Sequence, residues 1–180
     1  MKKILLTLAL ASAVCGAQAA PIDSFSAALG ESTRPHGENT PDVLRLSVTK
    51  DWDTRWFETS TGYLTGYWEF AMGAFKPQDT TAFDVDVVPM FRYQFNVGAN
   101  WCKPFVELGV GVAYLSEHKV TDDHDLTSHA QFSDRIGAGC GFDAGRQEVG
   151  INFHHFSNGG LDRPNPGIDF LLMRYAYHFE

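Results

Sequence analysis

A histidine and a serine lie two positions apart near the end of the chain, in His155-Phe156-Ser157. Residues i and i+2 of a β-strand project from the same face with their bases roughly 6 to 7 Å apart, so an imidazole can reach the hydroxyl. A serine becomes an effective nucleophile when a base accepts its proton, and the imidazole in turn needs a third group to fix its tautomer. The pattern indicates acyl-transfer chemistry, although a histidine and a serine can also simply mark the polar end of a strand.

Two carboxylates follow this pair and could supply the third group. Asp162 lies in a segment that contains glycine and proline, and it is more typical of a solvated loop charge. Asp169 begins the last predicted strand, in phase with Leu171 and Met173. If that strand pairs antiparallel with the strand that carries the histidine, Asp169 projects from the same face, so we expect it to orient the imidazole.

From residue 22 onward, apolar and polar residues alternate in segments of about ten residues, separated by clusters of Gly, Asp, Asn and Pro. This period predicts β-strands at 22–32, 42–52, 62–75, 83–95, 101–115, 131–143, 147–157 and 167–179. We therefore expect an all-β fold, an eight-stranded antiparallel up-and-down transmembrane β-barrel that comprises residues 21–180.

One face of these strands is apolar and the other carries charge, as Val85 and Val87 against Asp84 and Asp86 show. A water-soluble β-sandwich has the same alternation, so three further features favour the membrane. Connections alternate between short and long, and the last strand has an aromatic row that ends in Phe179. Aromatic residues also gather at strand ends, where membrane interfaces are expected: Trp52, Trp56, Tyr63, Tyr67 and Trp101.

The interior of an eight-stranded barrel is only wide enough for side chains, which argues against a wide pore. We expect a polar network there, made by Glu69, Asp84, Asp86, Glu107 and Arg135. With an even number of strands, both termini lie at the periplasmic end, and strand 147–157 ends at the cell exterior. Its outward row includes the histidine and the serine, so an ester of a membrane lipid fits the pair better than a water-borne substrate.

The first 20 residues have the pattern of a cleaved secretory signal peptide: Lys2 and Lys3, an apolar run over 4–14, and the small residues 17–20. Loss of the two lysines changes the formal charge from -8 to -10, which argues against nucleic acid as a partner. No later segment is apolar for long enough to form a transmembrane helix. We expect a protein that is exported and inserts in the outer membrane as a multi-pass barrel.

Two cysteines remain after removal of the leader, Cys102 and Cys140; their sequence positions leave a bridge open but favour two unpaired thiols. His154 is expected to face the lumen. Three histidines and three aspartates lie in one connection, where a solvated external loop is favoured over a metal site. These are His118, His124 and His129 with Asp122, Asp123 and Asp125.

The run His155-Phe156-Ser157-Asn158-Gly159-Gly160-Leu161, with Gly167-Ile168-Asp169 downstream, resembles the H-x-S-N-x-G-L motif and acidic residue of the PagL-type lipid A 3-O-deacylases. The stretches 52–68, 134–135 and 148–150 are also similar to that family, so the resemblance covers nearly the whole mature chain. It implies a serine esterase of the outer membrane that removes the ester-linked acyl chain at the 3-position of lipid A, without a metal or an organic cofactor.

By this resemblance His155 is the base, Ser157 the nucleophile and Asp169 the third member, where the family commonly has Glu. Asn158 and the backbone N–H of Gly160 match positions of the oxyanion hole. The implied partners are lipid A or lipopolysaccharide and outer-membrane lipids, and the sequence leaves a homodimer open. Cations that could meet lipid A phosphates are Arg34, Lys76, Lys119 and Arg163.

Two other classes of function fit the same fold. A structural or adhesive small barrel would have no use for the serine. A barrel phospholipase or acyltransferase would share an outer-leaflet substrate and differ in the leaving group or the acceptor.

Overall fold

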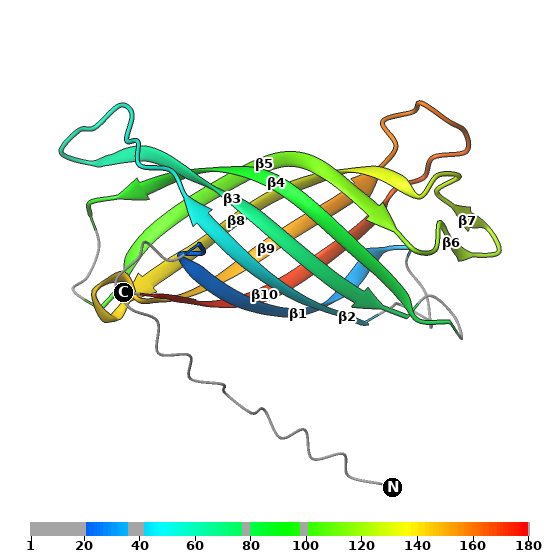
Figure 1. Ribbon diagram of the computed structural model, residues 1–180, viewed down its shortest axis with the longest axis horizontal. Helices are drawn as coiled ribbons and strands as arrows, with labels where there is room; N and C mark the ends of the chain where they lie inside the picture. The colour runs from blue at the N-terminus through cyan, green and yellow to red at the C-terminus, as the bar shows by residue number, and fades with distance from the viewer. Residues whose placement is uncertain (1–20, 36–41, 77–79, 98–100, 180) are drawn as a thin grey trace, which may run out of the picture.

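The computed structural model describes residues 21–35, 42–76, 80–97 and 101–179; the expected leader lies outside these residues. Eight long antiparallel strands close into a barrel in the order β1-β10-β9-β8-β5-β4-β3-β2 (Figure 1). They are β1 (Ser24–Arg34), β2 (Asp42–Asp51), β3 (Gly62–Phe75), β4 (Ala82–Phe95), β5 (Lys103–Leu115), β8 (Ala130–Phe142), β9 (Gln147–Ser157) and β10 (Ile168–His178). The predicted fold class is confirmed, and no helix in the described ranges is long and apolar enough to cross a membrane.

Each barrel strand pairs with the strands before and after it, and β1 closes the barrel against β10. Two smaller elements were not expected. A short hairpin, β6 (Lys119–Thr121) and β7 (His124–Asp125), stands in the connection between β5 and β8, and a 3-10 turn η1 (Asp143–Gly145) joins β8 to β9. The hairpin strands are too short to produce a period-two pattern, so the sequence could not predict them.

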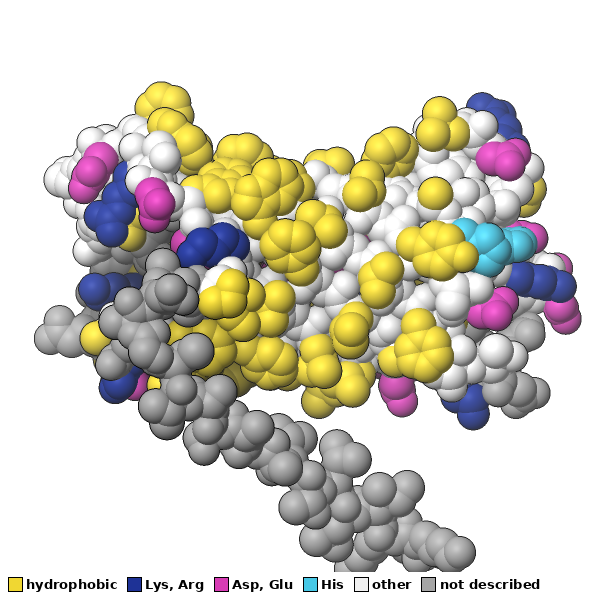
Figure 2. All heavy atoms as spheres, in the orientation of Figure 1, with side chains coloured by type: hydrophobic (Ala, Val, Ile, Leu, Met, Phe, Trp, Pro, Cys, Tyr) yellow, Lys and Arg dark blue, Asp and Glu magenta, His cyan; other side chains and the backbone are white. Residues whose placement is uncertain are grey.

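The outer wall of the barrel is apolar. Figure 2 shows hydrophobic side chains over the middle of the wall and charged side chains gathered towards the two ends. Leu29, Ile136 and Met173 are 63%, 60% and 74% exposed, although a water-soluble sandwich would bury such residues. Apolar side chains outside and charges inside are the arrangement of a barrel that has lipid as its solvent.

The lumen holds the polar network that the sequence predicted. All five expected residues are buried, and four further charged side chains join them: Arg45, Arg92, Glu148 and Arg174. Arg45 pairs with Asp84 and Asp86 at 2.5 Å each, and Arg135 pairs with Asp86 and Glu69. Buried charges cost several kcal/mol unless they are paired, so this network is what permits a charged interior. It also fills the space that a pore would need.

Tyr67 corrects one prediction. It was expected in the interfacial aromatic belt, but it is buried in the lumen and its hydroxyl donates to Glu107 Oε2 at 2.8 Å. Its strand phase, two residues before Glu69, decides this, because residues i and i+2 share a face. Trp52 does lie on the outer wall, where its ring packs 5.0 Å from that of Phe91 and 6.2 Å from that of Trp68.

The two ends of the barrel differ. Figure 1 shows the C-terminus and the start of β1 at one end, which we call the terminal end. The backbone N–H of Phe179 donates to Asp23 O at 2.8 Å there, so the described ends of the chain are in contact. The β9–β10 connection and the β6–β7 hairpin lie at the opposite end, which we call the loop end.

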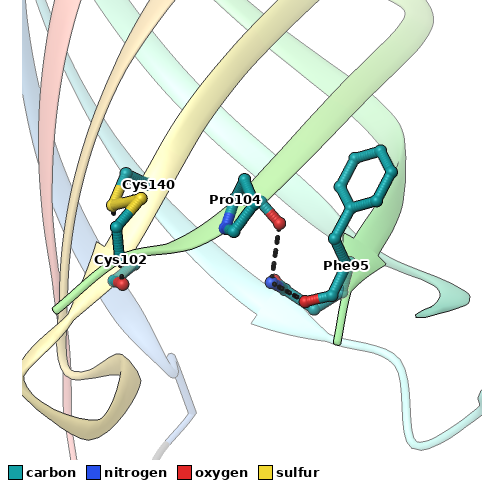
Figure 3. The surroundings of a disulfide bond; sticks show 6 residues. Phe95, Cys102, Pro104 and Cys140 are labelled. Atoms are coloured by element: carbon teal, nitrogen blue, oxygen red, sulfur yellow. Dashed lines mark hydrogen bonds between the residues drawn. A yellow bond between two sulfur atoms is a disulfide. The ribbon is translucent and has the colours of Figure 1, made fainter. Parts of the chain in front are cut away.

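A disulfide joins Cys102 to Cys140 at the terminal end (Figure 3), so the expectation of two unpaired thiols was wrong. The reason is strand register. β5 and β8 are neighbours, with Pro104 opposite Cys140, and the two cysteine Cα atoms are 5.3 Å apart. That separation lies within the range of natural disulfides. Sequence spacing alone could not reveal which strands of the barrel are neighbours in this register.

Candidate active site

The outward row of β9 ends in His155 and Ser157. Burial alternates along the strand: Val149, Ile151 and Phe153 are exposed, whereas His154 and Phe156 are buried. His155 and Ser157 follow the exposed phase and are half-buried. The structure therefore places both on the outer wall at the loop end, and places His154 in the lumen.

Asp169 lies directly across from His155 in the register between β10 and β9. Its Oδ1 is 2.5 Å from Nδ1 of the imidazole, which makes this a short contact between a carboxylate and a ring nitrogen. A neutral imidazole that donates from Nδ1 leaves Nε2 with a free lone pair, which is the form that a general base requires. The antiparallel pairing of β9 and β10 thus places a carboxylate acceptor at Nδ1, where it favours this tautomer.

The Asp169 carboxylate is buried although its phase is outward, because a residue of β1 covers it. Nε of Arg34 lies 3.0 Å from Asp169 Oδ2, and Nη1 of the same side chain donates to Pro166 O at 2.7 Å. Arg34 had been considered only as a loop cation for lipid phosphates. No sequence signal pointed to this pairing, since it depends on closure of the barrel between β1 and β10.

The Ser157 hydroxyl makes no hydrogen bond with any of the described residues. Its cross-strand neighbour is Phe132 of β8, a partly exposed ring on the same wall. Catalytic hydrogen bonds are often long in the absence of substrate and shorten in the complex. The structure brings His155 and Asp169 into contact and leaves Ser157 on the same face of β9.

Asn158 and Gly160 follow the serine in a tight turn. The Gly160 N–H donates to Asn158 Oδ1 at 2.9 Å, and the Asn158 amide Nδ2 donates to Leu126 O at 3.1 Å. The structure thus brings together the two groups that the resemblance assigned to the oxyanion hole. The Gly160 N–H and one of the two N–H groups of the Asn158 amide already bind protein oxygens, so at Gly160 an oxyanion would have to replace the acceptor.

The β6–β7 hairpin supports this turn and the loop that follows it. His124 is buried, with Nε2 at 2.5 Å from Gly167 O, and Thr127 Oγ1 donates to Pro164 O. The connection is therefore not the solvated loop that was expected. Within the described residues, no group of three or more His, Cys, Asp or Glu side chains is arranged to hold a metal ion.

Inside the hairpin, His118 Nδ1 lies 2.7 Å from Asp125 Oδ1. The hydrogen bond to His118, together with one from the backbone N–H of Thr127, lowers the pKa of Asp125 below that of an ordinary aspartate. The Asp125 carboxylate thus ties His118 to the turn at Thr127, beside His124, whose side chain reaches the β9–β10 loop.

Two other carboxylates belong to the elements on either side of β9. Asp162 is exposed in the β9–β10 loop and accepts a hydrogen bond from the backbone of Arg163. Asp134 is the residue of β8 opposite His155 and is half-buried on the outer face. From the sequence, Asp134 was known only as part of the resemblance, because its place opposite His155 depends on the register of β8 with β9.

The remaining loop cations do not gather at the site as one group. Lys119 pairs with Asp122 at 3.0 Å, and Lys76 and Arg163 are exposed. Fold and residue positions together define a small membrane β-barrel with a candidate hydrolase site on its outer wall, at the loop end.

Comparison with known proteins supports this class. The family profile described as lipid A 3-O-deacylase (PagL) matches residues 42–178. A Pseudomonas aeruginosa protein named lipid A deacylase PagL is 39% identical over 181 residues, which cover 97% of this chain and 98% of that protein. A Bordetella bronchiseptica protein of the same name is 32% identical over 113 residues, which cover 63% of this chain and 58% of the relative.

The barrel also matches a crystal structure of the outer membrane enzyme PagL. The TM-score is 0.77 at 37% sequence identity, and the match covers 87% of this chain and 99% of that one. The chain belongs to the lipid A 3-O-deacylase (PagL) family. The resemblance seen in the sequence is thereby confirmed.

Proposed function

We propose that Ser157, His155 and Asp169 carry out the 3-O-deacylation of lipid A after which the family is named. The observation that carries the proposal is the 2.5 Å contact between His155 and Asp169 on the lipid-facing wall, with the serine on the same row. A soluble esterase keeps its serine, histidine and carboxylate in a cleft. Here these residues face lipid, so the substrate has to reach them within the membrane.

The first half of the reaction transfers the acyl group to the serine. His155 Nε2 takes the Ser157 proton as Oγ attacks the ester carbonyl at the 3-position. The tetrahedral intermediate collapses, the C–O bond to the sugar breaks, and the imidazolium returns the proton to the departing sugar oxygen. Asp169 holds the imidazole and stabilises its cationic form.

In the second half, water replaces the sugar. His155 deprotonates a water molecule that attacks the acyl-enzyme, and a free 3-hydroxy fatty acid leaves as Ser157 recovers its proton. We assign the Gly160 N–H and the Asn158 side chain, which lie in the turn directly after the serine, to the developing oxyanion. For this role the Gly160 N–H must exchange Asn158 Oδ1 for the substrate oxygen.

The loop end would face the cell exterior, so the row on β9 lies at the depth of the outer leaflet. Residues 1–20 would direct export and be removed. The lipid-facing site and the outward loops give the enzyme direct access to lipopolysaccharide without extracting it from the membrane.

The decisive experiment is mass spectrometry of lipid A from cells that express the wild type or Ser157→Ala. We expect the wild type alone to remove one 3-linked hydroxyacyl mass. A deacylated product from both would exclude Ser157 as the nucleophile, and an unchanged spectrum from both would favour a structural or adhesive barrel. Lysophospholipid, or a new acyl chain on a recipient lipid, would identify a phospholipase or an acyltransferase.

The role of Asp169 is tested by a pair of matched variants. Asp169→Asn removes the charge beside the imidazole, and we expect kcat to fall by about 10³-fold or more. Asp162→Asn makes the same chemical change in the exposed loop and should leave kcat unaltered. Equal activity of the two variants would remove Asp169 from the mechanism.

A further inference from the structure

We propose that Arg34 is a positioning residue for the reaction, which holds the Asp169 carboxylate in line with His155. The proposal depends on the proposed function of the site and adds a fourth member to it. It starts from the two contacts of the guanidinium: Nε with Asp169 Oδ2 at 3.0 Å, and Nη1 with Pro166 O at 2.7 Å.

A β-bulge brings Arg34 to this place. Along β1 the outward phase runs through Phe25, Leu29 and Glu31, so strict alternation would turn Arg34 towards the lumen. The pairing with β10 shifts between Ser32 and Arg34, which opposes Arg34 directly to Asp169. A bulge next to a functional site is a common means of redirecting one side chain.

The two carboxylate oxygens of Asp169 then have separate partners. Oδ1 faces His155 Nδ1, and Oδ2 faces Arg34 Nε. Among the described residues, Arg34 is the one side chain that forms an ion pair or hydrogen bond with Oδ2. If this contact is removed, the carboxylate can rotate about its χ2 and the 2.5 Å contact with the imidazole loses its fixed direction.

The planar guanidinium suits this task better than an ammonium group would. It presents several N–H donors in a rigid fork, so one side chain can hold a carboxylate and a backbone carbonyl at once. The carbonyl is that of Pro166, the neighbour of Gly167, whose Cα lies against the His155 ring. Arg34 therefore ties β1 both to the carboxylate and to the loop that abuts the imidazole.

The side chain of Arg34 is 51% exposed, so it could instead contact a phosphate of the substrate. The two roles have different kinetic signatures. A residue that acts through Asp169 changes kcat and has no effect once Asp169 is disabled. A residue that binds the substrate changes KM whether or not Asp169 is present.

The test is a double-mutant cycle with purified full-length enzyme and hexa-acylated lipid A in mixed micelles. Release of 3-hydroxy fatty acid gives kcat and KM for the wild type, Arg34→Gln, Asp169→Asn and the double variant. We expect Arg34→Gln to lower kcat by about fivefold to tenfold with little change in KM, as for loss of one half-exposed charge-assisted hydrogen bond. The double variant should be no slower than Asp169→Asn alone.

Controls separate this proposal from the proposed function. Arg55→Gln changes another exposed arginine, at the terminal end, and should retain wild-type kcat. Mobility on unheated denaturing gels reports whether each barrel is folded. Full activity of Ser157→Ala would overturn the proposed function itself. With Ser157→Ala inactive, an unchanged kcat in Arg34→Gln, a rise in KM alone, or an equal loss in both Asp169 backgrounds would overturn the role of Arg34.

Discussion

Gly167 offers a way to move the imidazole without changing any residue of the proposed triad. A Cβ at this position would lie 2.5 Å from His155 Cε1 and 3.3 Å from Nε2. Non-bonded carbon atoms prefer about 3.5 to 4.0 Å, so the ring of a Gly167→Ala variant must retreat by about 1 Å. A displacement of that size between reacting groups can cost about 10²-fold in rate. We expect Gly167→Ala to lower kcat by about this factor while the barrel stays folded.

Backbone strain has to be separated from this steric effect. Gly167 has φ +70°, a left-handed conformation that costs an L-residue about 1 to 2 kcal/mol. Gly145, in the turn at the terminal end, has φ +93° and open space around its Cα. Gly145→Ala is therefore the matched control, since it carries similar strain without the contact, and its kcat should remain within about twofold of the wild type.

The assay is the release of 3-hydroxy fatty acid from lipid A by purified enzyme, with the wild type and both alanine variants compared at saturating substrate. If Gly167→Ala and Gly145→Ala have the same rate, the position of the imidazole does not limit the reaction and the reasoning from the contact distance is refuted.

Two further predictions concern the ends of the barrel. Replacement of Cys102 and Cys140 by serine should lower the free energy of unfolding by about 2 to 4 kcal/mol, measured in denaturant titrations. The kcat should not change, because the disulfide lies at the end of the barrel opposite the site. A variant with altered kcat and unaltered stability would contradict this prediction. The β6–β7 hairpin should loosen when Asp125 loses its charge. The pKa of Asp125 is lowered in the folded state, so the carboxylate stabilises the hairpin fully at any pH above the pKa of an ordinary aspartate. This stabilisation is lost as the pH falls through the lowered pKa. Asp125→Asn should show the same loosening at neutral pH as faster amide exchange at Leu126 and Thr127. Unchanged exchange would show that the hydrogen bonds of the Asp125 carboxylate do not hold the hairpin.

The faces of the strands could be predicted from the sequence because one physical rule governs them. Side chains alternate with period two, and in a membrane barrel the two environments differ as strongly as lipid and a charged lumen. Glu69, Asp84 and Glu107 were assigned to the lumen on this basis, and they are buried there. The same parity placed the histidine and the serine on one outward row of β9, where the structure has them.

The alternation of side chains could not predict features that depend on strand register or on departures from regular strand pairing. The bridge between Cys102 and Cys140 follows from the register of β5 against β8, which alternation does not specify. The place of Arg34 follows from a bulge, which reverses the face that alternation assigns. The β6–β7 hairpin is set by tertiary contacts such as His124 with Gly167 O, and segments of two or three residues carry no period of their own.

The position of the site follows from how the fold is stabilised. The lumen of this eight-stranded barrel is filled by side chains, and its arginines and carboxylates neutralise one another. A charged catalytic group placed among them would need a partner of its own, because an unpaired buried charge is costly. The candidate residues stand instead on the outer wall, where strand pairing between β9 and β10 places the histidine opposite Asp169. That wall contacts lipid, so a site there suits a substrate that the membrane delivers.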